Sequence, residues 1–229
     1  MDIRQTNNTK ENQSVQVLAG QVKLEGNLSI PSGAEGIVLF AHGSGSSRHS
    51  PRNIYVAQVL QDVDVATLLI DLLTEEEEEI DLQTRHLRFD IGLLAQRLVG
   101  ATDWLQKKSE TKNLNIGYFG ASTGAAAALV AAAERQKIVK AIVSRGGRPD
   151  LAGSANLSKV QAPTLLIIGG NDEPVIGMNK EAFEQLTNIE DNNKKKIVIV
   201  PGATHLFEEP GKLEKVAGLA TEWFVKYLR

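Results

Sequence analysis

The stretch from Leu114 to Glu134 constrains the fold more than any other part of the chain. It reads LNIGYFGASTGAAAALVAAAE, so an apolar run typical of a buried strand passes directly into an alanine-rich segment with the composition of a helix. The change occurs at Gly120-Ala121-Ser122-Thr123-Gly124, which has the pattern G-x-S-x-G. Small residues on both sides of the serine permit a very sharp turn from strand to helix. The pattern therefore predicts that Ser122 stands at the carboxyl end of a strand with its hydroxyl exposed.

A serine in this position can act as a nucleophile. The backbone N–H of Thr123, at the start of the helix, would face the place where a negatively charged oxygen develops, and so belongs to a predicted oxyanion hole. The same pentapeptide also arises by chance, and Ser122 could instead be an ordinary helix N-cap flanked by glycines that serve packing. The strand before it and the helix after it favour the nucleophile.

Apolar segments alternate with helical patterns along the rest of the chain. This alternation predicts an α/β fold with a doubly wound, mainly parallel sheet and an antiparallel N-terminal hairpin. We expect one domain over residues 14–229 after a frayed terminus at 1–13, and no cap domain, because too few residues separate Ser144 from Pro163 to form one. The predicted strands are 15–19, 22–30, 36–41, 65–72, 139–144, 163–168 and 196–200, and the predicted helices are 54–60, 81–108, 181–186 and 213–228.

Composition excludes several classes of function. The 229 residues include no cysteine, which rules out disulfides, a thiolate nucleophile and zinc–thiolate sites. The net charge of -3 offers no basic surface for nucleic acid or an anionic membrane. The polar start MDIRQTNNTKENQ has no signal-peptide core and no run is long enough to span a membrane, so we expect a cytoplasmic protein. Five consecutive glutamates, 75–79, suit a solvated helix start better than a metal site, and we expect no metal and no cofactor.

Polar residues follow several predicted strands at their carboxyl ends, where loops of a doubly wound sheet converge. Ser122 is followed along the chain by Asp172 in GGNDEP and by His205 in PGATH. A serine, an acid and a histidine in this order match one type of catalytic triad, with His205 as general base and Asp172 orienting its ring. Glu173, next to Asp172, and Asp71, after an earlier strand, are the alternative acids.

The loop His42-Gly43-Ser44-Gly45-Ser46-Ser47 follows the first buried strand. Its glycines let the backbone approach a substrate, so we predict that Ser44 supplies a second oxyanion N–H and that His42 and Gly43 contact substrate. A phosphate-binding glycine loop is the alternative, but the third glycine of G-x-G-x-x-G is missing.

Three arginines lie near the same predicted edge. Guanidinium groups fork carboxylate or phosphate oxygens, so we predict that Arg145 and Arg48 bind a negatively charged part of the substrate. For Arg148 we favour a surface ion pair with a nearby acid.

Taken together, HGSGSS, GASTG, GGNDEP and GATH give nearly the whole chain a resemblance to the α/β-hydrolase superfamily. The small size and missing cap are similar to the dienelactone-hydrolase-related branch, although dienelactone hydrolase itself has a cysteine nucleophile where this chain has Ser122. The resemblance implies a hydrolase of small carboxylic esters, lactones or thioesters that works through an acyl-enzyme. A small-peptide hydrolase and a non-catalytic binding module stay open as alternatives. The expected partner is a small-molecule ester or lactone, and the sequence leaves the oligomeric state open.

Overall fold

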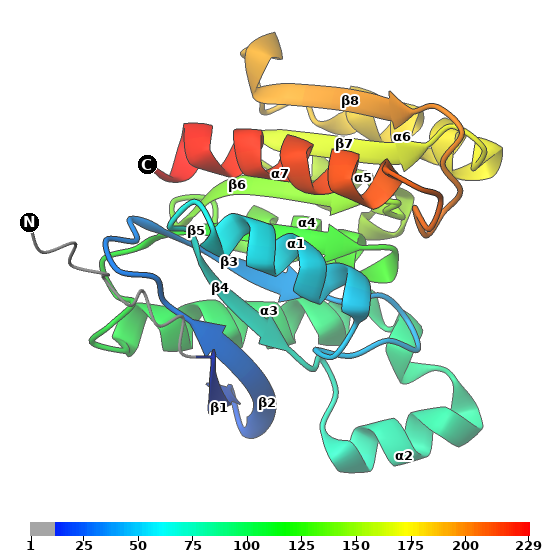
Figure 1. The fold of residues 1–229 in the computed structure, drawn as a ribbon. Helices are drawn as coiled ribbons and strands as arrows, with labels where there is room; N and C mark the ends of the chain where they lie inside the picture. The colour runs from blue at the N-terminus through cyan, green and yellow to red at the C-terminus, as the bar shows by residue number, and fades with distance from the viewer. Residues whose placement is uncertain (1–11) are drawn as a thin grey trace, which may run out of the picture.

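An eight-stranded sheet runs through residues 12–229, the part of the chain described by this computed structural model (Figure 1). Its order is β1-β2-β4-β3-β5-β6-β7-β8, with β1, β2 and β4 paired antiparallel and all later neighbours parallel. The strands are β1 Asn12–Ala19, β2 Val22–Ser29, β3 Gly36–Ala41, β4 Ala66–Ile70, β5 Asn115–Ala121, β6 Val139–Arg145, β7 Thr164–Gly169 and β8 Lys195–Val200. The predicted mainly parallel sheet with an N-terminal hairpin is confirmed.

Helices cover both faces of this sheet (Figure 1). One face carries α1 Pro51–Gln61 and α7 Lys212–Leu228, and the other carries α3 Ile91–Lys107, α4 Thr123–Glu134 and α6 Glu173–Gln185. A further helix, α2 Glu75–Thr84, projects from one end of the molecule. The short elements are α5 Ser154–Leu157 and the 3-10 turns η1 Leu87–Phe89, η2 Pro149–Ala152 and η3 Asn192–Lys194. No cap is inserted between β6 and β7, as the sequence predicted.

The central strands are buried on both faces, which explains their unbroken apolar sequences. Successive side chains of a strand point to opposite faces. Leu39 of β3 and Tyr118 of β5 therefore enter the core under α3 and α4, while Phe40 and Phe119 enter the core under α1 and α7. The two phenyl rings stack with centroids 4.9 Å apart.

The last helix lies unusually close to the sheet because glycines leave room for it. A Cβ atom on Gly36 of β3 would lie 2.5 Å from Cβ of Leu228, and one on Gly117 of β5 would lie 2.9 Å from the ring of Phe224. Both α7 side chains are fully buried. Glycine at these two positions thus sets how deeply α7 packs on the central strands.

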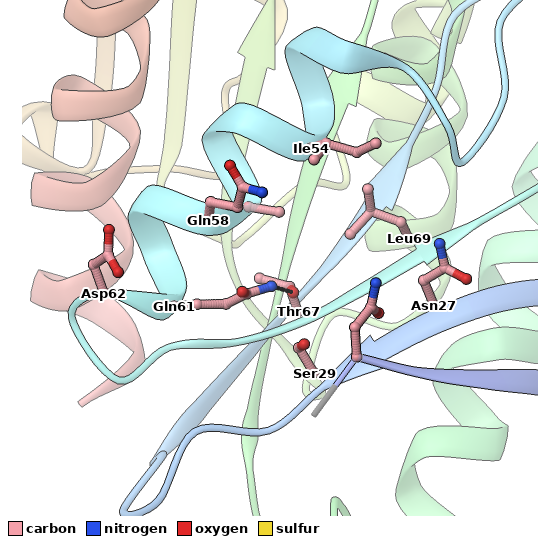
Figure 2. A pocket seen from close by; sticks show the side chains of 10 residues that line it. Asn27, Ser29, Ile54, Gln58, Gln61, Asp62, Thr67 and Leu69 are labelled. Carbon is pink, nitrogen blue, oxygen red and sulfur yellow. Dashed lines mark hydrogen bonds between the residues drawn. The ribbon is translucent and has the colours of Figure 1, made fainter. Parts of the chain in front are cut away.

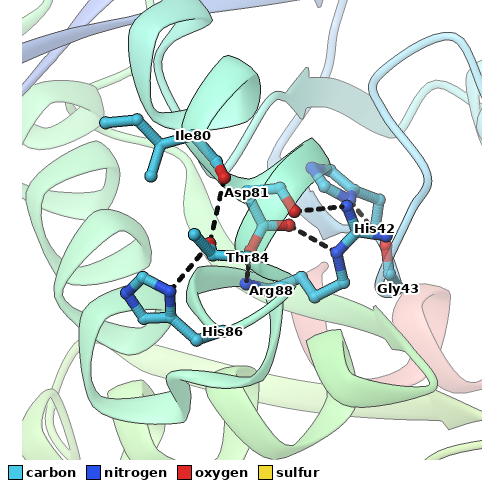
Figure 3. A network of polar contacts seen from close by, with 7 residues as sticks. All are labelled: His42, Gly43, Ile80, Asp81, Thr84, His86 and Arg88. Atoms are coloured by element: carbon cyan, nitrogen blue, oxygen red, sulfur yellow. Dashed lines mark hydrogen bonds and ion pairs between the residues drawn. The ribbon is translucent and has the colours of Figure 1, made fainter.

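The prediction of one helix over 81–108 is wrong. Arg85 ends α2 in the left-handed conformation with φ 57°, and Asp90 begins α3 by accepting a hydrogen bond from Leu93 N–H at 2.9 Å. Between them, the fully buried Asp81 carboxylate pairs with Nε of Arg88 and accepts its backbone N–H at 3.1 Å (Figure 3). The chain therefore folds back at this point because a buried ion pair and two caps stabilise the break.

The glutamate run begins α2, as expected of a solvated helix start. Thr74 accepts from Glu77 N–H and Glu77 reaches back to Thr74 N–H, a capping box that satisfies two free donors. Within residues 12–229 no group of acids or histidines is arranged to hold a metal ion.

Some boundaries differ from the predicted ones. Residues 1–11 of the terminus expected to fray lie outside the described part, and β1 begins at Asn12. Helix α6 begins at Glu173, eight residues before the predicted start at 181. In the part of the chain described here, no helix combines the length and apolar character needed to cross a bilayer.

Candidate active site

The carboxyl ends of β3 and β5 form the switch point of the sheet. The chain leaves β3 through α1 to β4 on one side, and β5 later joins β3 on the other side. Connections that diverge in this way leave a crevice at the carboxyl ends of the strands. The loop after β3 and the serine after β5 both open into it.

Ser122 stands in the sharp turn between β5 and α4. Its backbone has φ 50° and ψ -121°, a conformation that a non-glycine residue adopts only where its surroundings enforce it. Gly124 is one cause, because a Cβ atom there would collide with the carbonyl oxygens of Ala41 and His42. The turn predicted from the glycine pattern is therefore present, and it brings α4 directly against the end of β3.

The segment after β6 braces this turn from the other side. Ser122 N–H donates to the carbonyl of Arg145 at 3.3 Å, and the Ser122 carbonyl accepts from Arg148 N–H at 3.1 Å. Gly146, with φ 50°, and Gly147 let the chain bend here, and any side chain on Gly147 would collide with Ser144. The motif SRGGRP thus holds the serine in place through its backbone.

His205 and Asp172 follow the carboxyl ends of β8 and β7, and their side chains meet there. Nδ1 of His205, on the loop between β8 and α7, donates to Oδ2 of Asp172 at 2.7 Å, because a carboxylate can only accept. The side chain of Asp172 is 14% exposed and that of His205 is 36% exposed, so the ring keeps an accessible side. Of the three acids considered, Asp172 is the one paired with His205, while Asp71 pairs with Arg48 and Glu173 begins α6.

Backbone contacts fix the two loops that carry this pair. Gly170 N–H donates to the carbonyl of Val200 at 2.8 Å, and Asn171 N–H donates to the carbonyl of Ala203 at 2.9 Å. A Cβ atom on Gly169 would lie 2.5 Å from the Ala203 carbonyl oxygen. Glycine at the end of β7 therefore allows the acid loop and the histidine loop to lie against each other.

One cavity of about 220 Å³ brings Ser122 and His205 together. Its wall also includes Gly43 and Ser44 from the loop after β3 and Arg145 from the end of β6. The other lining residues are Ser46, Ser50, Arg52, Asn53, Ala121 and Leu206. Ser122, His205 and two arginines, Arg52 and Arg145, therefore share one space.

Thr123 and Ser44, the predicted oxyanion residues, flank the serine. Thr123 is the first residue of α4, where backbone N–H groups have no partner within the helix. The glycine loop lies against the turn, since a Cβ atom on Gly43 would be 3.0 Å from Cβ of Ser122. Thr123 thus follows Ser122 in the chain, and the glycine loop that carries Ser44 packs against the turn.

His42 is engaged on both ring nitrogens. Nδ1 donates to the Gly43 carbonyl at 2.9 Å, and Nε2 accepts from Leu72 N–H at 3.0 Å. Burial lowers the pKa of His42, which keeps the ring neutral. The ring lines a neighbouring cavity with Arg48 and Asp71, and it does not line the space that Ser122 and His205 share. Its contacts are those of a residue that ties the glycine loop to the end of β4.

The three arginines have different surroundings. Arg48 pairs with Asp71 through both its backbone N–H and its side chain, and it lines the neighbouring cavity. Arg148 makes a bidentate ion pair with Asp150, with contacts of 2.8 to 3.2 Å, so the predicted surface ion pair is confirmed. Arg145 alone of the three lines the cavity with Ser122.

Helix α1 contributes residues to the cavity that were not predicted from the sequence. Ser50 caps this helix by accepting from Asn53 N–H, and Ser50, Arg52 and Asn53 all line the cavity. The signal was present, because Ser50-Pro51 is a typical helix start and it follows the carboxyl end of β3. A helix that begins there must present its first turn to the crevice.

A larger cavity of about 480 Å³ lies between α1 and the strands β2 and β4 (Figure 2). Amides and hydroxyls line it, including Asn27, Gln58 and Gln61, and Gln61 donates to Thr67 Oγ1 at 2.8 Å. None of Ser122, Asp172 and His205 lines it. The candidate site is therefore the smaller cavity.

Comparison with known proteins identifies the family. The model of the dienelactone hydrolase family matches residues 53–227, most of the chain. The chain belongs to the dienelactone hydrolase family. A solved dienelactone hydrolase from Anabaena variabilis is 67% identical, with 96% of this chain and 99% of that chain covered and a TM-score of 0.92. Est1E from Butyrivibrio proteoclasticus shares the fold at 18% identity, with 94% and 98% covered and a TM-score of 0.76.

This member of the dienelactone hydrolase family also resembles part of a longer protein. It is 56% identical over 216 residues to a Mycobacterium tuberculosis protein named "Putative phosphoribosyl transferase", found in two strains. The match covers 94% of this chain and 46% of the relative. The chain thus spans about half the length of the curated relatives that it matches.

Proposed function

We propose that the chain is a serine hydrolase that cleaves small carboxylic esters, lactones or thioesters through an acyl-enzyme. Its family and its 67% identity to a dienelactone hydrolase support hydrolysis of ester bonds. The observation that carries the proposal is the 2.7 Å hydrogen bond between His205 and Asp172, with His205 lining the same cavity as Ser122.

In the proposed reaction, Ser122 Oγ attacks the carbonyl carbon while Nε2 of His205 takes its proton. Asp172 holds the Nδ1 proton and stabilises the imidazolium that forms. The backbone N–H groups of Thr123 and Ser44 donate hydrogen bonds to the negatively charged oxygen that develops from the carbonyl. Collapse of this intermediate breaks the C–O bond, and the alcohol leaves with the proton from His205. Water then gives a proton to His205, attacks the acyl carbon and releases the acid, while Ser122 regains its proton.

The shape of the site favours small substrates. The cavity has a volume of only about 220 Å³, and no cap lies between β6 and β7 to enclose a long acyl chain. We therefore propose short esters and lactones as substrates.

The test of the proposal is covalent labelling with a fluorophosphonate, which reacts with activated serines. The parent should be labelled at Ser122, and a non-catalytic binding module would not be. Ser122→Ala should lower kcat for a short p-nitrophenyl ester by several orders of magnitude, on the order of 10⁴ to 10⁶. Comparing the ester with the matching anilide separates an esterase from a small-peptide hydrolase, since the latter would cleave both.

A double-variant cycle tests whether the three residues act as one unit. Because the loss of any member disables the same step, Ser122→Ala combined with His205→Ala should cost little more than either change alone. If the fold-losses of activity in the two single variants multiply in the double variant, the residues act independently and the proposed triad is wrong.

The name of the mycobacterial relatives supports a second candidate, transfer of a phosphoribosyl group. The match with this chain covers 46% of the relative. An assay for phosphoribosyl transfer should therefore use this chain by itself. Release of the leaving group from an activated phosphoribosyl donor would support it. Unchanged release by Ser122→Ala would place that activity outside the proposed triad.

A further inference from the structure

Arg145 is buried without a counter-charge. Its exposed fraction is 6%, its Nε has no hydrogen-bond partner, and none of residues 12–229 forms an ion pair with it. Burial, together with the positive charge of Arg52, lowers the pKa of Arg145 to about 10. Each of six other arginines faces a carboxylate: Arg48, Arg52, Arg88, Arg97, Arg135 and Arg148. A buried guanidinium left unpaired beside a cavity requires an anion to balance its charge.

The walls of the cavity add further positive potential. Arg52 lines it, and the acid that pairs with Arg52, Glu208, is 63% exposed, so water weakens that ion pair. The first turn of the eleven-residue helix α1 also opens on the cavity, and the N-terminus of a helix attracts anions. None of the described residues that line the cavity is acidic. The space next to Ser122 is therefore suited to a negatively charged group.

The number and kind of donors indicate which anion fits. Two arginines, Arg145 and Arg52, and three serines, Ser44, Ser46 and Ser50, line the space. A carboxylate has two oxygens and one charge, so a single forked arginine satisfies it. A phosphate monoester has three terminal oxygens and a charge of about -1.5 to -2 at neutral pH, which matches two arginines and additional hydroxyl donors.

We propose that this cavity is a phosphate subsite, and that the substrate is a short ester or lactone carrying a phosphate monoester held by Arg145 and Arg52. The proposal rests on the proposed hydrolase function, because Ser122 would attack the same molecule. Since the cavity of about 220 Å³ contains both the arginines and Ser122, the phosphate must lie only a few bonds from the carbonyl that reacts. The phosphate would then orient the carbonyl toward the nucleophile.

Calorimetry with non-hydrolysable probes tests the subsite without any need for turnover. Propyl phosphate, butyrate and 1-butanol are titrated into the parent at the same pH and ionic strength. Propyl phosphate should bind about tenfold or more tightly than butyrate, and 1-butanol should not bind measurably. Equal binding of propyl phosphate and butyrate would overturn the assignment to phosphate, and failure of both to bind would overturn the subsite.

Substitution of the two arginines tests whether propyl phosphate binds in this cavity. Arg145→Gln should weaken propyl phosphate binding by about tenfold or more, because it removes a charge-assisted fork. Arg52→Gln should weaken it as well, and this more exposed position provides the test if Arg145→Gln does not fold. The matched control is Arg135→Gln at the opposite end of α4, where the arginine pairs with Asp103 and should not affect binding. Unchanged binding in Arg145→Gln and Arg52→Gln would overturn the proposal.

Kinetics connect the subsite to the reaction. An acyl ester ending in phosphate should have a higher kcat/KM than the same ester ending in a methoxy group, and Arg145→Gln should remove the difference mainly through KM. Equal kcat/KM values in the parent would overturn the proposed substrate class. The two proposals fail separately: arginine-dependent phosphate binding without fluorophosphonate labelling would overturn only the hydrolase, and labelling without phosphate binding would overturn only the subsite.

Discussion

At the scale of single residues, the backbone conformation of Ser122 depends on the packing that a neighbouring glycine, Gly124, permits. Its positive φ costs on the order of 1–3 kcal/mol, which the surrounding packing must offset. Gly124 contributes because its missing Cβ lets the first turn of α4 lie against the carbonyls that end β3. The position of the hydroxyl is thus set by backbone packing.

Gly124→Ala should therefore reduce both activity and stability. The added methyl would push α4 away from β3, and we expect kcat to fall by about tenfold or more and the free energy of unfolding to fall by about 1–3 kcal/mol. Gly177→Ala is the control, because Gly177 also lies within a helix but no atom comes within 4 Å of its missing Cβ. That variant should be slightly more stable, by about 0.5–1 kcal/mol, with unchanged kcat. Equal effects of the two changes in urea unfolding and ester hydrolysis would contradict this account.

His42 makes the stability of the protein sensitive to acid. Its folded pKa is lowered by burial, which outweighs the bond to the Gly43 carbonyl and the charges of Asp71 and Glu78. The unfolded chain, with a histidine pKa near ~6.5, therefore binds a proton that the folded chain excludes. Stability is fully present above that pH and is lost as the pH falls below it toward the folded pKa.

His42→Gln should remove this part of the pH dependence. A glutamine can donate and accept at the same positions but cannot gain a proton in this range. Urea unfolding followed from pH 7 to pH 5 should show a shallower loss of stability in His42→Gln than in the parent. Parallel curves would mean that another group takes up the proton.

At the scale of secondary-structure elements, the break between α2 and α3 depends on Asp81 and Arg88. Figure 3 shows the carboxylate enclosed between the end of α2 and the turn η1. Removing one member of a buried pair leaves the other charge without compensation, which is more costly than removing both. We therefore expect the ion pair to determine where the chain breaks between α2 and α3, and to contribute little net free energy of unfolding.

Asp81→Leu should lower the free energy of unfolding by about 3 kcal/mol, because Arg88 would keep a largely buried charge. The double variant Asp81→Leu with Arg88→Met should recover much of that loss. Urea unfolding of the three proteins measures both changes. A double variant that is as unstable as the sum of the single ones would show that the two residues act independently.

The elements that sequence analysis predicted well are those whose signal is local. The strands β3 and β7 are almost entirely apolar runs bounded by turn residues, and the turn at Ser122 is encoded by its own glycines. The end of α2 could not be seen in this way, since Arg85 is an ordinary helix former and only the structure shows its left-handed conformation and the ion pair of Asp81 with Arg88 across the break. The start of α6 was missed because Pro174 and Gly177 stand in its first turns, and both residue types disfavour the interior of a helix.

The candidate site was predictable to the same extent and for the same reason. Ser122, Asp172 and His205 each follow a strand, so their approach to one edge of the sheet could be deduced from order along the chain. His42 and Arg48 also follow a strand, but their partners Leu72 and Asp71 lie more than twenty residues away and bind both side chains outside the cavity. Proximity to the edge could be predicted, whereas the direction of each side chain could not.

At the scale of the whole molecule, α7 completes the hydrophobic core that it shares with α1 on one face of the sheet. Leu228 and Phe224 fill the space left by glycines in β3 and β5, the two strands that lead to the candidate site. The last turn of the chain therefore stabilises the centre of the sheet.

Leu228→Ala should lower the free energy of unfolding by about 2–5 kcal/mol, because a fully buried leucine leaves a cavity that rigid strands cannot close. Since Leu228 lies at the end of α7 farthest from the histidine loop, KM for a short ester should not change. Thermal unfolding and steady-state kinetics check the two expectations. A large change in KM with little loss of stability would mean that α7 controls the site rather than the core.

The packing of α7 against Gly36 and Gly117 also affects the nascent chain during translation. Every strand of the sheet has been synthesised before residues 212–228 emerge from the ribosome, yet the part of β3 and β5 that α1 does not cover on this face stays exposed until α7 docks. Exposed apolar surface of this kind invites aggregation or capture by chaperones. Docking of α7 is thus expected to be the step that removes this exposed surface from the nascent chain.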